Sequence, residues 1–172
     1  MKRAIFLDRD GVINIDKNYV HKIEDFEFAK GAKEALKHFL DDRYILIVIT
    51  NQSGIGRGYY TKKDFEKLTN WMLNELKKDS IFIKKVYFCP HKPEDKCECR
   101  KPNPKMILDA KKEFNLDLKN SWLIGDKESD IEAGLNAGIK KTILIGDRPS
   151  KAKYVVKSIL DTISIIRKSD EI

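Results

Sequence analysis

The stretch Ala4-Ile5-Phe6-Leu7-Asp8-Arg9-Asp10-Gly11 decides the fold. A short apolar run that ends at once in acids is typical of a strand buried inside a parallel sheet. If the extended backbone continues to Asp10, the carboxylates of Asp8 and Asp10 face the same side. One could then attack a phosphorus atom while the other moves protons. An acidic turn with Gly11 at a positive φ explains the same residues, and both interpretations stay open here.

Strand and helix patterns alternate along the rest of the chain. We expect strands at 4–8, 44–50, 85–89, 122–126 and 142–145. Apolar residues at three- and four-residue spacing predict helices at 32–41, 63–77, 104–114, 129–136 and 150–167. This alternation predicts an α/β fold, a three-layer Rossmann-like open parallel sheet with helices on both faces.

In such a sheet the ligand lies at the carboxyl ends of the strands, so function should follow the strands directly. The 172 residues suit a single domain spanning 1–172. Two connections, 11–31 and 90–103, are long enough to be functional, yet too short to hold a cap domain.

Polar groups follow the other predicted strands as well. Asn51, Gln52 and Ser53 stand in a glycine-rich segment that could cradle phosphate oxygens, or be only a flexible loop. Arg100-Lys101 could grip an anion or be a solvated basic pair. The segment Gly125-Asp126-Lys127-Glu128-Ser129-Asp130 could supply a magnesium ligand and a carboxylate for Lys101, or a helix N-terminus.

A compact group of soft metal ligands follows the third predicted strand. Its members are Cys89, His91, Cys97 and Cys99. These three cysteines form a poor disulfide framework and a better metal cluster in a reducing compartment. Since four protein ligands close a tetrahedron, the spacing predicts structural rather than catalytic zinc.

Composition and charge limit the kinds of binding partner that we expect. Charged residues make up 35% of the chain and the formal net charge is +7, so an anionic ligand is attracted. The cations do not form a nucleic-acid motif, and the apolar run at the amino terminus is too short for a signal peptide or a membrane span. We expect a cytoplasmic protein, a monomer, that binds neither nucleic acid nor a membrane.

The acids and the segments that follow the strands resemble the haloacid-dehalogenase-like (HAD) phosphatases. Their motifs match Asp8-x-Asp10-Gly11, Thr50-Asn51, Lys101 and Gly125-Asp126-x-x-x-Asp130, across nearly the whole chain. With the cysteine segment, the pattern is most similar to the subgroup that acts on heptose bisphosphates and histidinol phosphate. The resemblance implies the nucleotide-activated heptose route to lipopolysaccharide or surface glycans.

The resemblance also implies roles for particular residues. Asp8 would be the nucleophile and Asp10 the general acid/base. Thr50 and Lys101 would stabilise the phosphoryl group. Magnesium would bind Asp8, the Asp10 carbonyl and Asp126, and zinc the four soft ligands. Substrate contacts would come from Arg9, Asp16, Lys17, Asn18, Tyr19, Asn51, Gln52, Ser53, Arg100 and Lys127.

Other functions remain possible at this stage. Histidinol-phosphate hydrolysis and a phosphatase acting on nucleic-acid ends would use the same machinery. A zinc-containing binding module without catalysis is a hypothesis of another class, but it would be expected to have lost Asp8, Asp10 or Asp126, all of which are present.

Overall fold

A six-stranded parallel sheet forms the centre of the protein. The computed structural model describes residues 1–171. The strands lie in the order β3-β2-β1-β4-β5-β6, and every neighbouring pair is parallel. Their bounds are β1 Ala4–Leu7, β2 Ile45–Asn51, β3 Lys85–Cys89, β4 Trp122–Gly125, β5 Lys141–Ile145 and β6 Tyr154–Val156. Because chain order reverses at β1, its carboxyl end lies where such sheets bind ligands.

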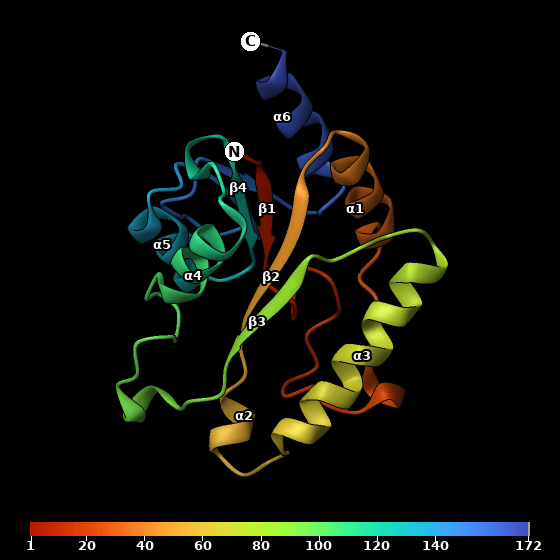
Figure 1. The fold of residues 1–172 in the computed structure, drawn as a ribbon, viewed down its shortest axis with the longest axis vertical. Helices are drawn as coiled ribbons and strands as arrows, with labels where there is room; N and C mark the ends of the chain where they lie inside the picture. Colours follow the sequence, from red (N-terminus) through yellow and green to blue (C-terminus); the bar gives the residue numbers. More distant parts are fainter. Residues whose placement is uncertain (172) are drawn as a thin grey trace.

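Helices cover both faces of the sheet. They are α1 Ala32–Asp41, α2 Ser53–Gly56, α3 Lys62–Lys78, α4 Lys105–Phe114, α5 Glu128–Ala137 and α6 Asp161–Asp170. Figure 1 shows α1 and α3 on one side of the sheet and α4 and α5 on the other. The fold class predicted from the sequence is therefore confirmed.

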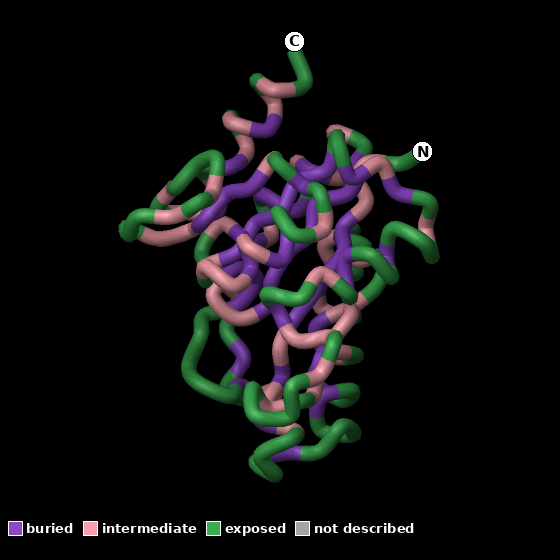
Figure 2. Tube along the Cα trace, turned by 90° about the vertical axis from the view of Figure 1, so that its left-hand side faces the viewer, coloured by how far each residue is buried: buried purple, intermediate pink, exposed green. Residues whose placement is uncertain are grey.

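Alternate residues of β1 supply two separate apolar cores. Ile5 and Leu7 pack in a cluster with side chains of α1, α3 and α6. Ala4 and Phe6 pack in a second cluster with α4 and α5. Figure 2 shows this buried centre under an exposed periphery. Because both faces of β1 are buried, the strand is apolar throughout and its register is strongly specified.

The helix predicted over 150–167 is wrong in its first half. Tyr154–Val156 forms the edge strand β6, with Tyr154 opposite Ile143 of β5. The helix begins only at Asp161, after a turn in which the Ser158 amide donates to the Asp161 carboxylate at 3.2 Å. An aromatic residue followed by two β-branched ones favours extended backbone, and the available edge of β5 lets that preference decide.

The long connections carry no cap. Within residues 1–171, the connection after β1 contains only the 3₁₀ turn η1 (Ile23–Asp25). The one after β3 contains only the 3₁₀ turn η2 (Pro93–Asp95). The cleft at the strand ends is thus shaped by local loops.

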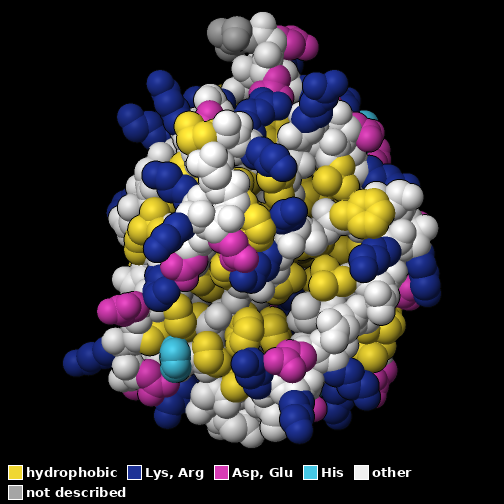
Figure 3. Space-filling view, viewed as in Figure 1, with side chains coloured by type: hydrophobic (Ala, Val, Ile, Leu, Met, Phe, Trp, Pro, Cys, Tyr) yellow, Lys and Arg dark blue, Asp and Glu magenta, His cyan; other side chains and the backbone are white. Residues whose placement is uncertain are grey.

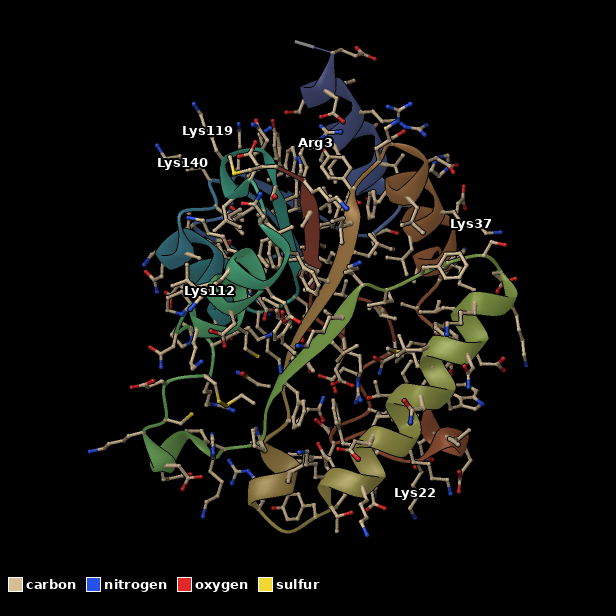
Figure 4. All side chains as sticks on the ribbon, viewed as in Figure 1. Arg3, Lys22, Lys37, Lys112, Lys119 and Lys140 are labelled. Atoms are coloured by element: carbon tan, nitrogen blue, oxygen red, sulfur yellow. A yellow bond between two sulfur atoms is a disulfide. The ribbon has the colours of Figure 1, made fainter. Side chains whose placement is uncertain are left out.

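Cations are spread rather than gathered on the face of the molecule drawn in Figure 3. Figure 3 shows Lys and Arg interspersed with Asp and Glu over the visible face. The exposed lysines labelled in Figure 4, Lys22, Lys37, Lys112, Lys119 and Lys140, lie on separate parts of the chain. None of the helices in the described part of the chain has the length and apolar character needed to cross a bilayer.

Candidate active site

A polar cleft of about 260 Å³ opens at the carboxyl ends of β1, β2 and β4. Asp8 follows β1 directly and is only 6% exposed. Its Oδ1 accepts a hydrogen bond from the Arg9 amide at 2.8 Å and lies 3.1 Å from the Lys101 ammonium. These contacts hold the carboxylate of Asp8 in one orientation at the floor of the cleft.

Lys101 and Asp130 form a buried ion pair beside Asp8. The Lys101 Nζ lies 2.6 Å from Asp130 Oδ1 and donates to the Ile49 carbonyl at 2.9 Å. Asp130 Oδ2 accepts from the amides of Asp126 and Lys127 at 3.2 and 3.1 Å. The two interpretations of Asp130 from sequence are therefore both correct, since one carboxylate caps α5 and orients the lysine.

Negative charge exceeds positive charge in this cluster. Burial, and next the charge of Asp130, raise the pKa of Asp8 well above its ordinary value, although Lys101 opposes this. Burial, and next Asp130, raise the pKa of Asp126 to about 6. Burial alone would lower the pKa of Lys101, yet Asp130 and Asp8 raise it above its ordinary value. A bound cation would oppose these shifts and favour the ionised forms of Asp8 and Asp126.

The donors fit a magnesium ion. Carboxylate oxygens of Asp8, Asp126 and Asp130 lie within 4.8 Å of one another. The Asp126 Oδ1 is buried and has no hydrogen-bond partner among the described residues. Lys101 and two amides already bind the oxygens of Asp130. The carboxylates of Asp8 and Asp126 are therefore the ones left to bind a hard cation, which prefers oxygen ligands.

Gly11 lets Asp126 approach the backbone after β1. Its φ is +90°, and a Cβ there would lie 2.0 Å from Asp126 Oδ2. Both the conformation and the lack of space thus require glycine. The acidic turn considered as an alternative explanation of this stretch exists, and it is part of the site.

The backbone that carries Asp10 to the cleft is a turn and not an extended strand. β1 ends at Leu7, and the turn that follows is closed by the Ile13 amide on the Arg9 carbonyl at 2.8 Å. Asp10 nevertheless lines the same cleft as Asp8. The extended backbone that would have placed both carboxylates on one side thus ends before Asp10, yet the two carboxylates lie at the same cleft.

Most of the predicted substrate contacts meet at this cleft. Three of them come from the loop after β1, namely Asp16, Asn18 and Tyr19. Three lie at the carboxyl end of β2 or directly after it, namely Asn51, Gln52 and Ser53. Lys127 follows β4, and Arg100 precedes Lys101 with a buried Nη1 that lacks a partner among the described residues. An unpaired guanidinium nitrogen at a cleft is suited to an anion.

Some predicted residues lie elsewhere. The Arg9 side chain is 1% exposed and donates to the Asp10 carboxylate and the Val20 carbonyl at 2.9 and 2.7 Å. Lys17 pairs with Glu27 at 3.1 Å and does not line the cleft. Thr50 is fully buried below the cleft, where its Oγ1 accepts from Gln52. The prediction that the Arg9 and Lys17 side chains face substrate is thus not supported.

Sequence reasoning missed residues that do line the cleft, namely Arg57, Tyr60 and Ser129. Arg57 lies four residues after Ser53, across the short helix α2, and donates to its hydroxyl at 3.5 Å. Tyr60 directly precedes Thr61, the N-cap of α3. Helical spacing from Ser53 and the Thr61 capping box were signals that could have found Arg57 and Tyr60.

The soft ligands also meet in space. Cys89 Sγ lies 3.5 Å from both His91 Nδ1 and Cys97 Sγ, and Cys99 Sγ lies 3.3 and 3.9 Å from the same atoms. A tetrahedral zinc site with Zn–S near 2.3 Å places its ligand atoms about 3.5 to 3.8 Å apart, so these donors fit. However, Cys89 and Cys99 are joined in a disulfide, with Cys97 free. The sequence did not predict this disulfide. Because zinc binds thiolates, the disulfide and a four-ligand zinc site exclude one another.

Comparisons with known proteins agree with this geometry. A family model described as HAD-hydrolase-like matches residues 98–161. The chain is 50% identical to D-glycero-alpha-D-manno-heptose-1,7-bisphosphate 7-phosphatase of Campylobacter jejuni, covering 98% of both proteins. The chain belongs to the heptose-1,7-bisphosphate 7-phosphatase family. It is also 54% identical, over 88% of both proteins, to the Helicobacter pylori (strain 26695) relative named for the beta anomer.

Solved structures place this family member among the HAD-like folds. The D,D-heptose 1,7-bisphosphate phosphatase of B. bronchiseptica, solved with magnesium and phosphate, matches with a TM-score of 0.88 and 26% identity. The match covers 98% of this chain and 99% of the other. Family and fold together identify the chain as a phosphatase.

Proposed function

We propose that this phosphatase removes the 7-phosphate of D-glycero-D-manno-heptose 1,7-bisphosphate with Mg²⁺, through a phosphoaspartate on Asp8. The observation that carries the proposal is the buried Asp8 carboxylate, held by Lys101 and the Arg9 amide at the floor of the polar cleft. The relatives named for this substrate support it, since they match the chain over nearly its whole length.

The proposed reaction has two steps. In the first, an Asp8 carboxylate oxygen attacks phosphorus and the bond from phosphorus to the sugar oxygen breaks, while Asp10 gives that oxygen its proton. In the second, Asp10 takes a proton from water as the water oxygen attacks the phosphoaspartate, which releases inorganic phosphate and restores Asp8.

The remaining residues would bind and orient the phosphoryl group. The Lys101 ammonium, kept protonated by Asp130, stabilises the charge on its oxygens, with Thr50 behind it. Asp8, Asp126 and the Asp10 carbonyl would hold Mg²⁺, which supplies charge neutralisation at the transferring phosphoryl group. Arg100, Lys127, Arg57 and the first loop would bind the rest of the substrate.

The cysteine group would hold structural zinc when its thiols are reduced. Its last ligand, Cys99, directly precedes Arg100 and Lys101. A metal at this point would fix the loop that presents both cations. A reducing compartment such as the cytoplasm would favour this form over the disulfide.

Phosphate release with Mg²⁺ tests the substrate assignment. Both anomers of the heptose bisphosphate are compared with histidinol phosphate at matched concentrations. We expect kcat/KM to favour one heptose anomer over histidinol phosphate by at least about 100-fold, or about 2.7 kcal/mol of transition-state binding. A preference for histidinol phosphate would overturn the substrate and leave the chemistry in place.

Asp8→Asn tests the chemistry itself. The amide is nearly isosteric but a poor nucleophile, so turnover of every phosphate ester should fall by at least about 10³-fold. A variant that keeps full turnover would revive the binding module without catalysis.

A further inference from the structure

Tyr60 is held rigidly beside the cleft. It is 5% exposed, and its ring stacks on His21 with 4.6 Å between centroids and 7° between planes. Gly54 packs so closely on the ring that a Cβ there would lie 2.1 Å from Tyr60 Cε1. The capping box of Thr61 fixes the backbone that follows. The position of the Tyr60 hydroxyl is therefore set by the fold.

The hydroxyl anchors the oxygen side of the Gln52 amide. Tyr60 Oη donates to Gln52 Oε1 at 2.5 Å. The other side of this amide, Nε2, donates to Asp10 Oδ2 at 3.2 Å and to Thr50 Oγ1 at 2.9 Å. Both amide hydrogens are thus used, and Gln52 is only 3% exposed. A flipped amide would lose both of these donated bonds, because its oxygen cannot donate to Asp10 Oδ2 or Thr50 Oγ1.

Asp10 is held from two sides. Arg9 and Asn14, both from the turn after β1, donate to its Oδ1 at 2.9 Å each. Gln52 is the donor to Oδ2 and the link to the β2 side of the cleft. Without the Tyr60 hydroxyl, Gln52 Oε1 loses the hydrogen bond that anchors this side of the amide.

We propose that Tyr60 is a positioning residue for Asp10, acting through the amide of Gln52. The hydroxyl fixes the amide, and the amide keeps the Asp10 carboxylate aimed at the sugar oxygen and aligned with Thr50. This proposal rests on the proposed function, in which Asp10 transfers protons. It gives Gln52 a role within the site that differs from the predicted contact with substrate.

A double-mutant cycle tests the proposal. Tyr60→Phe keeps the stacked ring and removes the hydroxyl, and kcat for the heptose bisphosphate should fall about 10- to 100-fold with little change in KM, since general acid–base catalysis is worth about 10² or more. In a Gln52→Leu background the same change should have no further effect, because the amide through which it acts is gone. Tyr59→Phe, the exposed neighbour, is the matched control and should keep wild-type rates and melting temperature.

A second substrate separates positioning from general damage. An aryl phosphate such as 4-nitrophenyl phosphate has a leaving group that needs little protonation, so its kcat/KM should fall less than about threefold in Tyr60→Phe. If Tyr60→Phe does not fold, Gln52→Glu, which puts an acceptor against Asp10, should show the same dependence on substrate.

Additive losses in the cycle, or an equal loss on both substrates, would overturn the role of Tyr60, as would unchanged kinetics. These outcomes presuppose an active wild-type enzyme. If the wild type hydrolyses neither ester, the proposed function fails first and the role of Tyr60 fails with it.

Discussion

At the scale of single residues, Gly11 decides whether Asp126 can stay in the site. Gly11→Ala would drive a methyl group into Asp126 Oδ2. We expect half-saturation by Mg²⁺ to need at least about tenfold more metal, because a displaced carboxylate loses a ligand bond that only a well-placed oxygen makes. The measurement is phosphatase activity against Mg²⁺ concentration.

The chain contains a matched control at Gly58. It has a similar φ of +78°, but a Cβ there meets nothing within 4 Å. Gly58→Ala should therefore share only the backbone strain of about 1–2 kcal/mol and keep the wild-type response to Mg²⁺. Equal responses in the two variants would mean that strain, rather than the approach to Asp126, is what matters at Gly11.

Arg100 lines the cleft, and its buried Nη1 has no hydrogen-bond partner among the described residues. Arg100→Ala should lower kcat/KM for the heptose bisphosphate about 10- to 100-fold, because a charge-assisted contact is lost, and leave the melting temperature within a few degrees. Lys105→Ala removes an exposed cation that pairs with Asp109 outside the cleft, so it should leave kinetics unchanged. Unchanged kinetics in Arg100→Ala would remove Arg100 from the substrate site.

At the scale of elements, the cysteine loop connects β3 to Lys101 at the cleft. With reduced thiols we expect close to one zinc per chain by elemental analysis, and Cys97→Ser should weaken zinc binding at least about tenfold by removing one of four ligands. Glu98→Gln, between Cys97 and Cys99, should not change zinc content. If the reduced protein binds no zinc, the disulfide between Cys89 and Cys99 is the cross-link that holds the loop.

Elements were predictable where one strong local pattern decides them. β1 is apolar on both faces and ends in acids, so its position, its burial and the site beside it follow from the sequence. β6 was missed because its apolar residues continue a helical spacing into α6, and only the edge of β5, a long-range partner, makes the segment extended. Local periodicity cannot represent such a partner.

The residues of the site were also predictable only where a local pattern places them. Asp8 and Asp126 directly follow β1 and β4, so topology alone brings them together, whereas Lys101 reaches them from the long loop after β3. The roles of Arg9, Gln52 and Tyr60 depend on side-chain direction, which spacing does not report. Thus Arg9 was expected at the substrate but donates to Asp10, and the bond from Tyr60 to Gln52 joins the segment before α3 to the residue after β2.

At the scale of the whole molecule, a polar cluster ties the start of the chain to its last helix. Arg3 donates to Asp170 at 2.8 Å and to the Tyr44 hydroxyl at 3.1 Å, and Tyr44 donates to Asp170 at 2.9 Å. The amino-terminal side of β1, the residue before β2 and the end of α6 thus meet at one point. The cluster lies at the amino ends of the strands, opposite the cleft, so its role is stability.

Titration of Tyr44 provides the test of that role. Burial, and next its hydrogen bond to Asp170, raise the pKa of Tyr44 to about 12 in the folded protein, against an ordinary value of 10.0. A raised pKa means that the stabilisation is fully present below pH 10 and is lost as the pH rises from about 10 to 12. The difference in melting temperature between wild type and Tyr44→Phe should therefore shrink across this window. Asp170→Asn should weaken this pH dependence because it replaces the charged carboxylate with a neutral amide, whereas a difference that stays constant with pH would show that the cluster adds no proton-linked stability.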